Sequence, residues 1–328
     1  MLSFFRTNQI FSSILLVFYI LLLRFSVLMS PPFVWTPSGT GVLSEWLYGW
    51  AGWQSLGAQI LAIVLLLVQG FLVNMIAINN RLPNEINLFP GVFYVLVSCL
   101  LPDFLYLSPV LIGNTFILIA IIELFATYKN PACADKIFNA GFWIGVASLF
   151  YFPFIFCIIF LIVGLGILRA FNTRERLMSL TGLFMPYLLA GMYYYAKDGF
   201  DVFWKIQVSD NLSFLSFGGI ESGWNTYVNI ALFALMLIYV LVDSNAYFAK
   251  RNIQVQKKIG ILYWVMASAL VGLFFQKNLS FEHLLMLAPS LGIFLAFTFT
   301  GMKRQWAESV HFLLVLGALA LQFIPWQL

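Results

Sequence analysis

Lys277, Glu282 and His283 lie within seven residues of one another, in a short polar segment between two long apolar stretches. A lysine ammonium binds phosphate as a point charge, and a histidine can donate a hydrogen bond or carry a proton near neutral pH. Ionisable groups at the end of a hydrophobic span are costly to place in lipid and are candidates for function. The segment therefore predicts a site for an anionic head group. The alternative is a polar turn between two helices that only needs to stay hydrated.

The elements that must position this segment are predicted to be membrane helices. The chain has 328 residues, of which 62% are hydrophobic and 9% charged, whereas soluble domains carry about 25% charged residues. Apolar runs of about twenty residues are long enough to cross a bilayer as helices. The weak alternation typical of an outer-membrane barrel is absent. The predicted fold is all-α, a polytopic integral membrane protein with a single transmembrane domain over residues 1–328.

The composition also argues against several classes of ligand. The net charge of +4 comes from basic residues scattered in short loops, so no nucleic-acid binding is predicted. The three cysteines show no metal or redox spacing, and two histidines are too few for a histidine-rich metal site. No nucleotide-binding loop or nucleophile elbow is present. No cofactor is predicted, although a divalent metal at an acidic residue is left open.

The distribution of cations predicts the orientation of the chain, because cytoplasmic loops carry an excess of Lys and Arg. About eleven transmembrane helices are expected, with the N-terminus inside and the C-terminus outside. The predicted spans are at about 10–29, 57–79, 91–107, 109–127, 137–152, 154–171, 177–196, 225–248, 259–276, 283–301 and 306–324. The inside loops then hold thirteen cations, namely Arg6, Arg81, Lys129, Lys136, Arg169, Arg174, Arg176, Lys250, Arg251, Lys257, Lys258, Lys303 and Arg304. The outside loops hold three, which are Lys197, Lys205 and Lys277.

Two details of this topology remain as alternatives. The segments 91–107 and 109–127 are short, and whether both cross fully is left open. Arg24 lies within the first span. It is expected to snorkel toward the outer interface, with pairing to an acid as the alternative.

Two outer loops carry the other candidate groups. The loop 30–56 contains four tryptophans, and its part 42–53 is predicted to be a helix at the membrane interface, where indole rings prefer to lie. An aromatic belt and packing are the main explanation for the aromatic residues, and stacking of Trp46 or Trp50 on a sugar is the more specific alternative. The orientation also places Glu45 and Asp103 on the outer face. The longest outer loop is expected at 197–224.

A family resemblance adds a specific activity to these features. Lys277, then His283, then the stretch LLMLAPSLGIFLA resemble a late motif of GT-C class polyprenyl-phosphate-dependent membrane glycosyltransferases. The class also carries an acidic residue in the first outer loop, where this chain has Glu45. The chain departs from the pattern because the usual paired acids are missing and Leu284 follows the histidine in place of an aromatic residue.

The GT-C resemblance implies sugar transfer from a polyprenyl-phosphate donor at the outer face of the inner membrane. Glu45 would then be the general base or a metal ligand, with Asp103 as the alternate acid. Lys277 and His283, with the neighbouring Glu282, would hold the donor phosphate. Trp46 and Trp50 would lie beside it.

A second resemblance, over about residues 1–200, is to an uncharacterised multi-span inner-membrane family of Bacteroidetes. It is carried by segments such as NRLPNEINLFPGVFYVLVSCLLPDFLYLSP. It implies a bacterial inner (cytoplasmic) membrane but no activity.

Two other functions remain as alternatives to glycosyl transfer. A transporter or flippase for a lipid-linked molecule would need polar groups through the bilayer, and the inner half of the chain is poor in them. A non-enzymatic membrane subunit would leave Glu45, Lys277 and His283 far apart. The expected partners are the lipid bilayer and a polyprenyl phosphate, and protein partners are left open.

Overall fold

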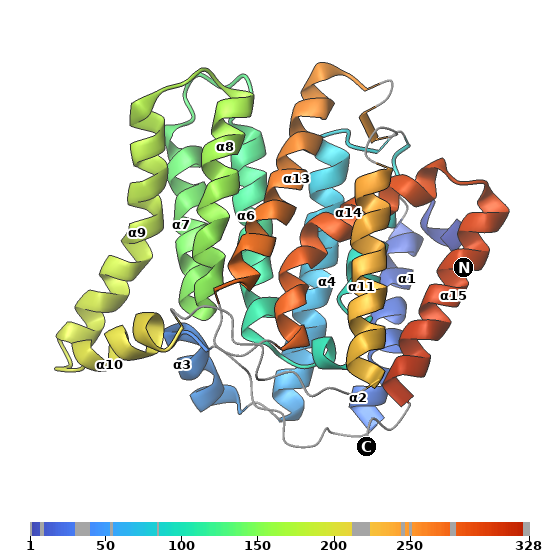
Figure 1. Cartoon of the computed structure of the whole chain (residues 1–328), viewed down its shortest axis with the longest axis horizontal. Helices are drawn as coiled ribbons and strands as arrows, with labels where there is room; N and C mark the ends of the chain where they lie inside the picture. Colours follow the sequence, from blue (N-terminus) through green and yellow to red (C-terminus); the bar gives the residue numbers. More distant parts are fainter. Residues whose placement is uncertain are drawn as a thin grey trace.

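The computed structural model describes residues 2–6, 10–29, 40–52, 55–83, 85–211, 224–243, 247–248, 251–275 and 280–323. Within these ranges the protein is helical and contains no strand (Figure 1), which confirms the all-α class. The elements are η1 (Leu2–Phe5), α1 (Ile10–Leu23), α2 (Phe25–Met29), α3 (Val42–Ala51), α4 (Leu56–Asn79), α5 (Phe89–Val97), η2 (Pro102–Leu105), α6 (Pro109–Ala126), α7 (Ala134–Phe150), η3 (Phe152–Cys157), α8 (Ile158–Leu168), α9 (Thr173–Tyr195), α10 (Phe200–Trp204), η4 (Lys205–Ser209), α11 (Trp224–Val242), α13 (Ile253–Leu273), η6 (Phe281–Leu287), α14 (Ala288–Gly301) and α15 (Arg304–Phe323).

The predicted spans coincide with these helices because each long apolar run ends at a polar loop. Each of the eleven predicted segments contains a described helix. In the part of the chain that the structure describes, Leu56–Asn79, Pro109–Ala126 and Phe281–Gly301 are long and apolar enough to cross a membrane. The outward sides of α9, α11 and α15 expose many large apolar side chains, as expected of surfaces that face lipid. The number of crossings and the absolute orientation stay predictions.

The segment 91–107 is a short buried helix followed by a turn and η2. All nine residues of α5 are buried, which is typical of a helix that is apolar on every side. Nine residues of α-helix extend only about 14 Å, at 1.5 Å per residue, and a hydrocarbon core is about 30 Å thick. Therefore α5 alone does not cross.

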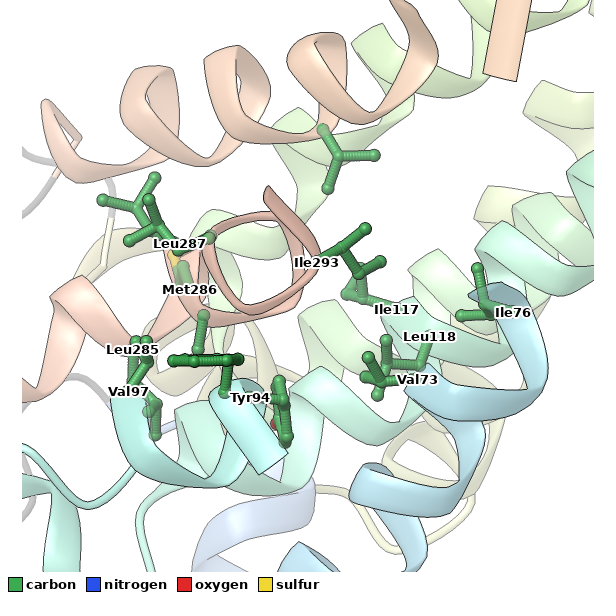
Figure 2. Packing of buried hydrophobic residues seen from close by; sticks show 14 of the residues in the cluster. Val73, Ile76, Tyr94, Val97, Ile117, Leu118, Leu285, Met286, Leu287 and Ile293 are labelled. Atoms are coloured by element: carbon green, nitrogen blue, oxygen red, sulfur yellow. The ribbon is translucent and has the colours of Figure 1, made fainter. Parts of the chain in front are cut away.

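The core is built around α14 and the η6 segment that precedes it. Every residue of α14 from Ala288 to Phe299 is buried, and α14 packs against α5. Figure 2 shows this packing from close by, with buried apolar side chains of η6 and α14 facing those of α4, α5 and α6, including Val73, Ile76, Tyr94, Val97, Ile117, Leu118, Leu285, Met286, Leu287 and Ile293. Among the three long apolar helices of the described residues, the polar segment containing Glu282 and His283 thus begins the most buried one, Phe281–Gly301.

The basic loops gather at one end of the bundle, which is the upper end in Figure 1. The buried ammonium of Lys258 on α13 donates a hydrogen bond to Asn80 Oδ1 at the end of α4. It also lies 5.7 Å from the centre of the Tyr128 ring after α6. Arg169, at the end of α8, pairs with Glu175 at 2.9 Å and donates to the Thr127 carbonyl at 3.1 Å. The contacts between these loops agree with the predicted sorting of cations to one side.

Helices α7 and α9 approach closely through small residues. Gly141 and Gly145 lie one turn apart on α7. A Cβ atom at Gly141 would lie 2.1 Å from the Ser179 carbonyl oxygen on α9, so a larger side chain would force the helices apart. Small residues four apart are typical of close packing between membrane helices. Gly141 and Gly145 therefore allow α9 to pack directly against α7.

The snorkelling prediction for Arg24 is wrong. This side chain is only 2% exposed, and its Nη2 donates a hydrogen bond to the Phe104 carbonyl oxygen at 3.1 Å. Arg24 therefore ties the end of α1 to η2. The guanidinium neither reaches the interface nor pairs with an acid, because its partner is a backbone carbonyl.

Candidate functional site

Glu282 and His283 form the first turn of η6 and are buried, at 1% and 2% exposure. Pro289, at the start of α14, limits how far the α-helix extends toward them, because proline lacks an N–H and clashes with the preceding turn. Asn114 on α6 donates a hydrogen bond from Nδ2 to the Leu285 carbonyl at 2.8 Å. The two ionisable side chains are thus held in a fixed position within the bundle.

Tyr151 is the direct partner of His283. Its hydroxyl lies 2.6 Å from His283 Nδ1, and the two rings stack with centroids 5.4 Å apart and an interplanar angle of 18°. Tyr151 lies between the end of α7 and the start of η3 and is 1% exposed. The contact fixes the orientation of the imidazole and joins two distant parts of the chain.

Tyr48 on α3 approaches the same cluster from the loop 30–56. Its hydroxyl donates to the Leu107 carbonyl at 2.9 Å. Burial raises the pKa of Tyr48, and the negative charge of Glu282 raises this pKa further. The charge of Glu282 acts on Tyr151 as well. We call Tyr48, Tyr151, Glu282 and His283 the outer cluster, because it lies at the end of the bundle away from the basic loops.

The start of α3 is held by hydrogen bonds to the end of α7. The Gly41 N–H and the Ser44 hydroxyl both donate to the Phe150 carbonyl, at 2.9 Å and 2.8 Å. Gln207 Oε1 on η4 accepts from the Val42 N–H at 3.1 Å. A side chain at position 41 would overlap the Leu149 carbonyl, since a Cβ there would lie 2.2 Å from that oxygen. Glycine is therefore required where α3 meets α7.

Three of the predicted site residues lie on the exposed side of α3. Trp46 and Trp50 are 72% and 81% exposed, and Glu45 is also exposed. Partial burial raises the pKa of Glu45, and the charge of Asp210 raises it too, while a hydrogen bond from Thr40 opposes the shift. The structure does not bring these side chains into the buried outer cluster. Their catalytic and sugar-binding roles stay predictions, as does the place of α3 at a membrane interface.

Asp103 lies closer to the outer cluster, because η2 packs against η6. Its side chain is half-buried, and burial raises the pKa of the carboxyl. Its charge in turn raises the pKa of Tyr106, after the larger effect of burial. An acid whose pKa is shifted toward neutrality is suited to proton transfer. Asp103 thus lies on a helix that packs against the one carrying Glu282 and His283, and its catalytic role stays a prediction.

Lys277 lies outside the described residues, so its predicted position next to His283 is not tested. Sequence reasoning missed Tyr48, Tyr151 and Asn114. The available signal for Tyr151 was its place at the junction of two predicted spans, in the sequence Tyr-Phe-Pro. Among the residues that the structure describes, no group of three or more His, Cys, Asp or Glu side chains could hold a metal ion.

An apolar groove is lined in part by η3, the short helix that follows Tyr151. It has a volume of about 690 Å³ and lies between η3, α9, α10 and η4. Helices α9 and α10 are on the left of Figure 1. Its lining includes Phe152, Tyr187, Leu188, Phe200 and Trp204. Phe152 directly follows Tyr151, so one lining residue is the chain neighbour of the residue that bonds His283. The α10 and η4 helices that close it fall within the segment predicted as a loop, 197–224.

No protein-family model matches the sequence, and a search of curated proteins also finds no match. Among solved structures, the fold is similar to that of ArnT from Cupriavidus metallidurans bound to undecaprenyl phosphate, with a TM-score of 0.57 and 13% sequence identity. The similarity covers 90% of this chain and 57% of that chain, so this protein spans a little over half the length of ArnT. The protein therefore has an ArnT-like membrane fold.

Proposed function

We propose that the protein is a GT-C-like membrane glycosyltransferase that uses a polyprenyl-phosphate sugar at the outer face of the membrane. The observation that carries this proposal is the outer cluster, which joins a buried histidine and a buried glutamate at one end of an ArnT-like bundle. The similarity to a protein solved with undecaprenyl phosphate supports a polyprenyl phosphate as the ligand. The inner membrane of a bacterium is the proposed location.

The proposed reaction assigns a role to each group. A base removes the proton of the acceptor hydroxyl, and the acceptor oxygen then bonds to the anomeric carbon of the sugar. The bond from that carbon to the phosphate oxygen breaks, and its electron pair leaves with the polyprenyl phosphate. Lys277 and His283 stabilise the negative charge of this leaving group. Asp103 is the proposed base, and Glu45 is the alternative.

The surroundings of His283 favour a role as a hydrogen-bond donor to a phosphate group. When the Tyr151 hydroxyl donates to Nδ1, the imidazole proton is held on Nε2, which makes Nε2 the donor nitrogen of the ring. The apolar groove lined in part by Phe152 would accept part of the polyprenyl chain, because such a chain is apolar and the groove wall consists mainly of aromatic and aliphatic side chains. Head group and tail would then occupy adjoining regions of the protein.

A non-enzymatic membrane subunit is the second candidate. The near-complete burial of Glu282 and His283 favours it, since a cluster that only stabilises the fold needs no access to a ligand. In that case the Tyr151–His283 contact would connect η3 to η6 and have no further role.

The chain offers a matched control that separates these two functions. His311 on α15 is also fully buried, and its Nε2 lies 3.1 Å from the hydroxyl of the stacked Tyr19 ring. The experiment measures undecaprenyl phosphate binding to purified wild type, Lys277→Ala, His283→Gln and His311→Gln in detergent, with thermal unfolding alongside. Both histidine variants are expected to lower the unfolding temperature, because each loses a buried hydrogen bond.

Only Lys277→Ala and His283→Gln are expected to weaken lipid binding, by at least tenfold, since a hydrogen bond to a charged group contributes about 1.5–3 kcal/mol. Equal binding by wild type and these two variants would leave the structural subunit as the better function. Normal lipid binding without sugar release from a polyprenyl-phosphate sugar would retain the lipid site but exclude the transferase.

A further inference from the structure

A polar pocket lies at the end of the bundle opposite the outer cluster. It has a volume of about 430 Å³ and is formed where the end of α4 meets the start of α13. Its lining is polar and contains Asn79, Asn80, Arg81, Arg251, Asn252 and Gln254. Pockets of about 300–1,000 Å³ are typical of small-ligand sites. This one is large enough for a phosphate-bearing head group.

The pocket carries positive charge that nearby acids do not neutralise. Within the described ranges, neither Arg81 nor Arg251 forms an ion pair. The ammonium of Lys258 lies next to the pocket on Asn80 Oδ1 and adds a third positive charge. Burial lowers the pKa of Arg251, but a guanidinium remains protonated at physiological pH. Of the acids at this end, Glu123, Glu175 and Glu308 are paired with other cations. Among the described residues, Glu85, Asp135 and Asp243 form no ion pair with Arg81 or Arg251.

Backbone donors add to these charges. Asn252 is the N-cap of α13, and its side chain makes no capping hydrogen bond. The first N–H groups of a helix have no partner within the helix, and together with the helix dipole they favour an anion. The first turn of this 21-residue helix lines the pocket at Gln254 and Val255. The two guanidinium groups and the helix start therefore lie on the same pocket.

Arg81 is also held in a conformation that glycine usually adopts. Its φ is 52°, and the N–H groups of Arg81 and Leu82 close the end of α4 on the carbonyls of Ile78 and Ala77 at 3.0 Å and 2.9 Å. This arrangement is the Schellman motif, in which glycine avoids the steric cost that an L side chain meets. Glycine would thus suit the backbone better, and the arginine supplies charge instead.

We propose that this pocket binds a phosphate group, carried either by an anionic phospholipid of the surrounding bilayer or by a soluble molecule. Arginine forks bind phosphate oxygens in pairs, and basic pockets between membrane helices bind anionic head groups. The outer cluster plays no part in this site, so the proposal is independent of glycosyl transfer.

The test uses the unusual backbone of Arg81. Arg81→Gly removes the guanidinium and relieves the backbone, so the fold should be at least as stable as in wild type. Lys129→Gly is the matched control, because Lys129 is an exposed cation at the same end with a φ of 55° and does not line the pocket. Arg251→Gln removes the second guanidinium. All four proteins are purified in detergent and compared by thermal unfolding.

Two probes distinguish the two sources of phosphate. Phosphatidylglycerol retained by the protein is measured by native mass spectrometry, and inorganic phosphate is titrated while the unfolding temperature is followed. Arg81→Gly and Arg251→Gln are each expected to weaken binding of one probe by at least tenfold, while Lys129→Gly binds it as wild type does. The proposal is overturned if wild type binds neither probe, or if Lys129→Gly loses as much as the pocket variants.

Discussion

Replacing Gly41 with alanine should detach α3 from α7. The new Cβ would lie 2.2 Å from the Leu149 carbonyl oxygen and 2.9 Å from that of Phe150. Because these are backbone atoms, α3 itself must move. The hydrogen bonds from the Gly41 N–H and the Ser44 hydroxyl to Phe150 would be lost, at about 0.5–1.5 kcal/mol each. The remaining overlap adds about 1–3 kcal/mol, so the attachment should weaken by about 2–6 kcal/mol in total.

Hydrogen exchange of the α3 amides, followed by mass spectrometry, measures this loss directly. Since about 1.4 kcal/mol corresponds to a factor of ten, exchange in Val42–Ala51 should accelerate by roughly one and a half to four orders of magnitude. Gly49→Ala is the control in the same helix, because a Cβ atom at that position would meet no other atom within 4 Å and alanine favours a helix over glycine by about 1 kcal/mol. Unchanged exchange in Gly41→Ala, or equal acceleration in Gly49→Ala, would refute the close-contact argument.

Three further predictions concern orientation, pH and the basic end. Single cysteines at Lys129 and Arg174 should resist an impermeant thiol reagent applied from outside, and one at Trp50 should react; the native cysteines Cys99, Cys133 and Cys157 are buried, and the reverse pattern would invert the orientation. Because burial raises the pKa of Asp103, the folded state binds this proton more tightly, and stability falls as the pH rises from the ordinary value of about 3.9 through the raised pKa. Asp103→Asn should therefore raise the unfolding temperature at pH 7 but not at low pH, and a pH-independent difference would contradict this. Arg169→Lys should lower stability by about 1–3 kcal/mol, because lysine cannot reproduce the forked contact with Glu175; wild-type thermal stability would count against it.

The positions of most helices could be predicted from the sequence because hydrophobic length and polar boundaries determine them. The segment predicted at 57–79 is α4 at Leu56–Asn79, and that at 109–127 is α6 at Pro109–Ala126. The prediction was less informative for α5, since a helix that is apolar on every side has the same pattern in lipid and in a protein core. Its burial depends on α14, which lies about two hundred residues later in the chain.

The candidate site was predicted only in part for a similar reason. The sequence indicates that Glu282 and His283 belong to one polar segment, but their partners come from remote parts of the chain. Tyr151 is 132 residues from His283, and Tyr48 reaches the cluster only because Gly41 allows α3 to approach α7. Arg24 gave no usable signal either, because its acceptor is a backbone carbonyl, and any residue type supplies one.

The 3₁₀ geometry of η6 determines how far the outer cluster reaches. A 3₁₀ helix rises about 2.0 Å per residue and an α-helix about 1.5 Å, so the seven residues of η6 extend about 3.5 Å further than they would as α-helix. With α14 fixed, a return to α-helical pitch would draw the start of η6 inward by that length. It would also rotate Glu282 and His283 relative to Tyr48 and Tyr151. The reach of the cluster is thus set by helical pitch, which can change without a flexible loop or a glycine hinge.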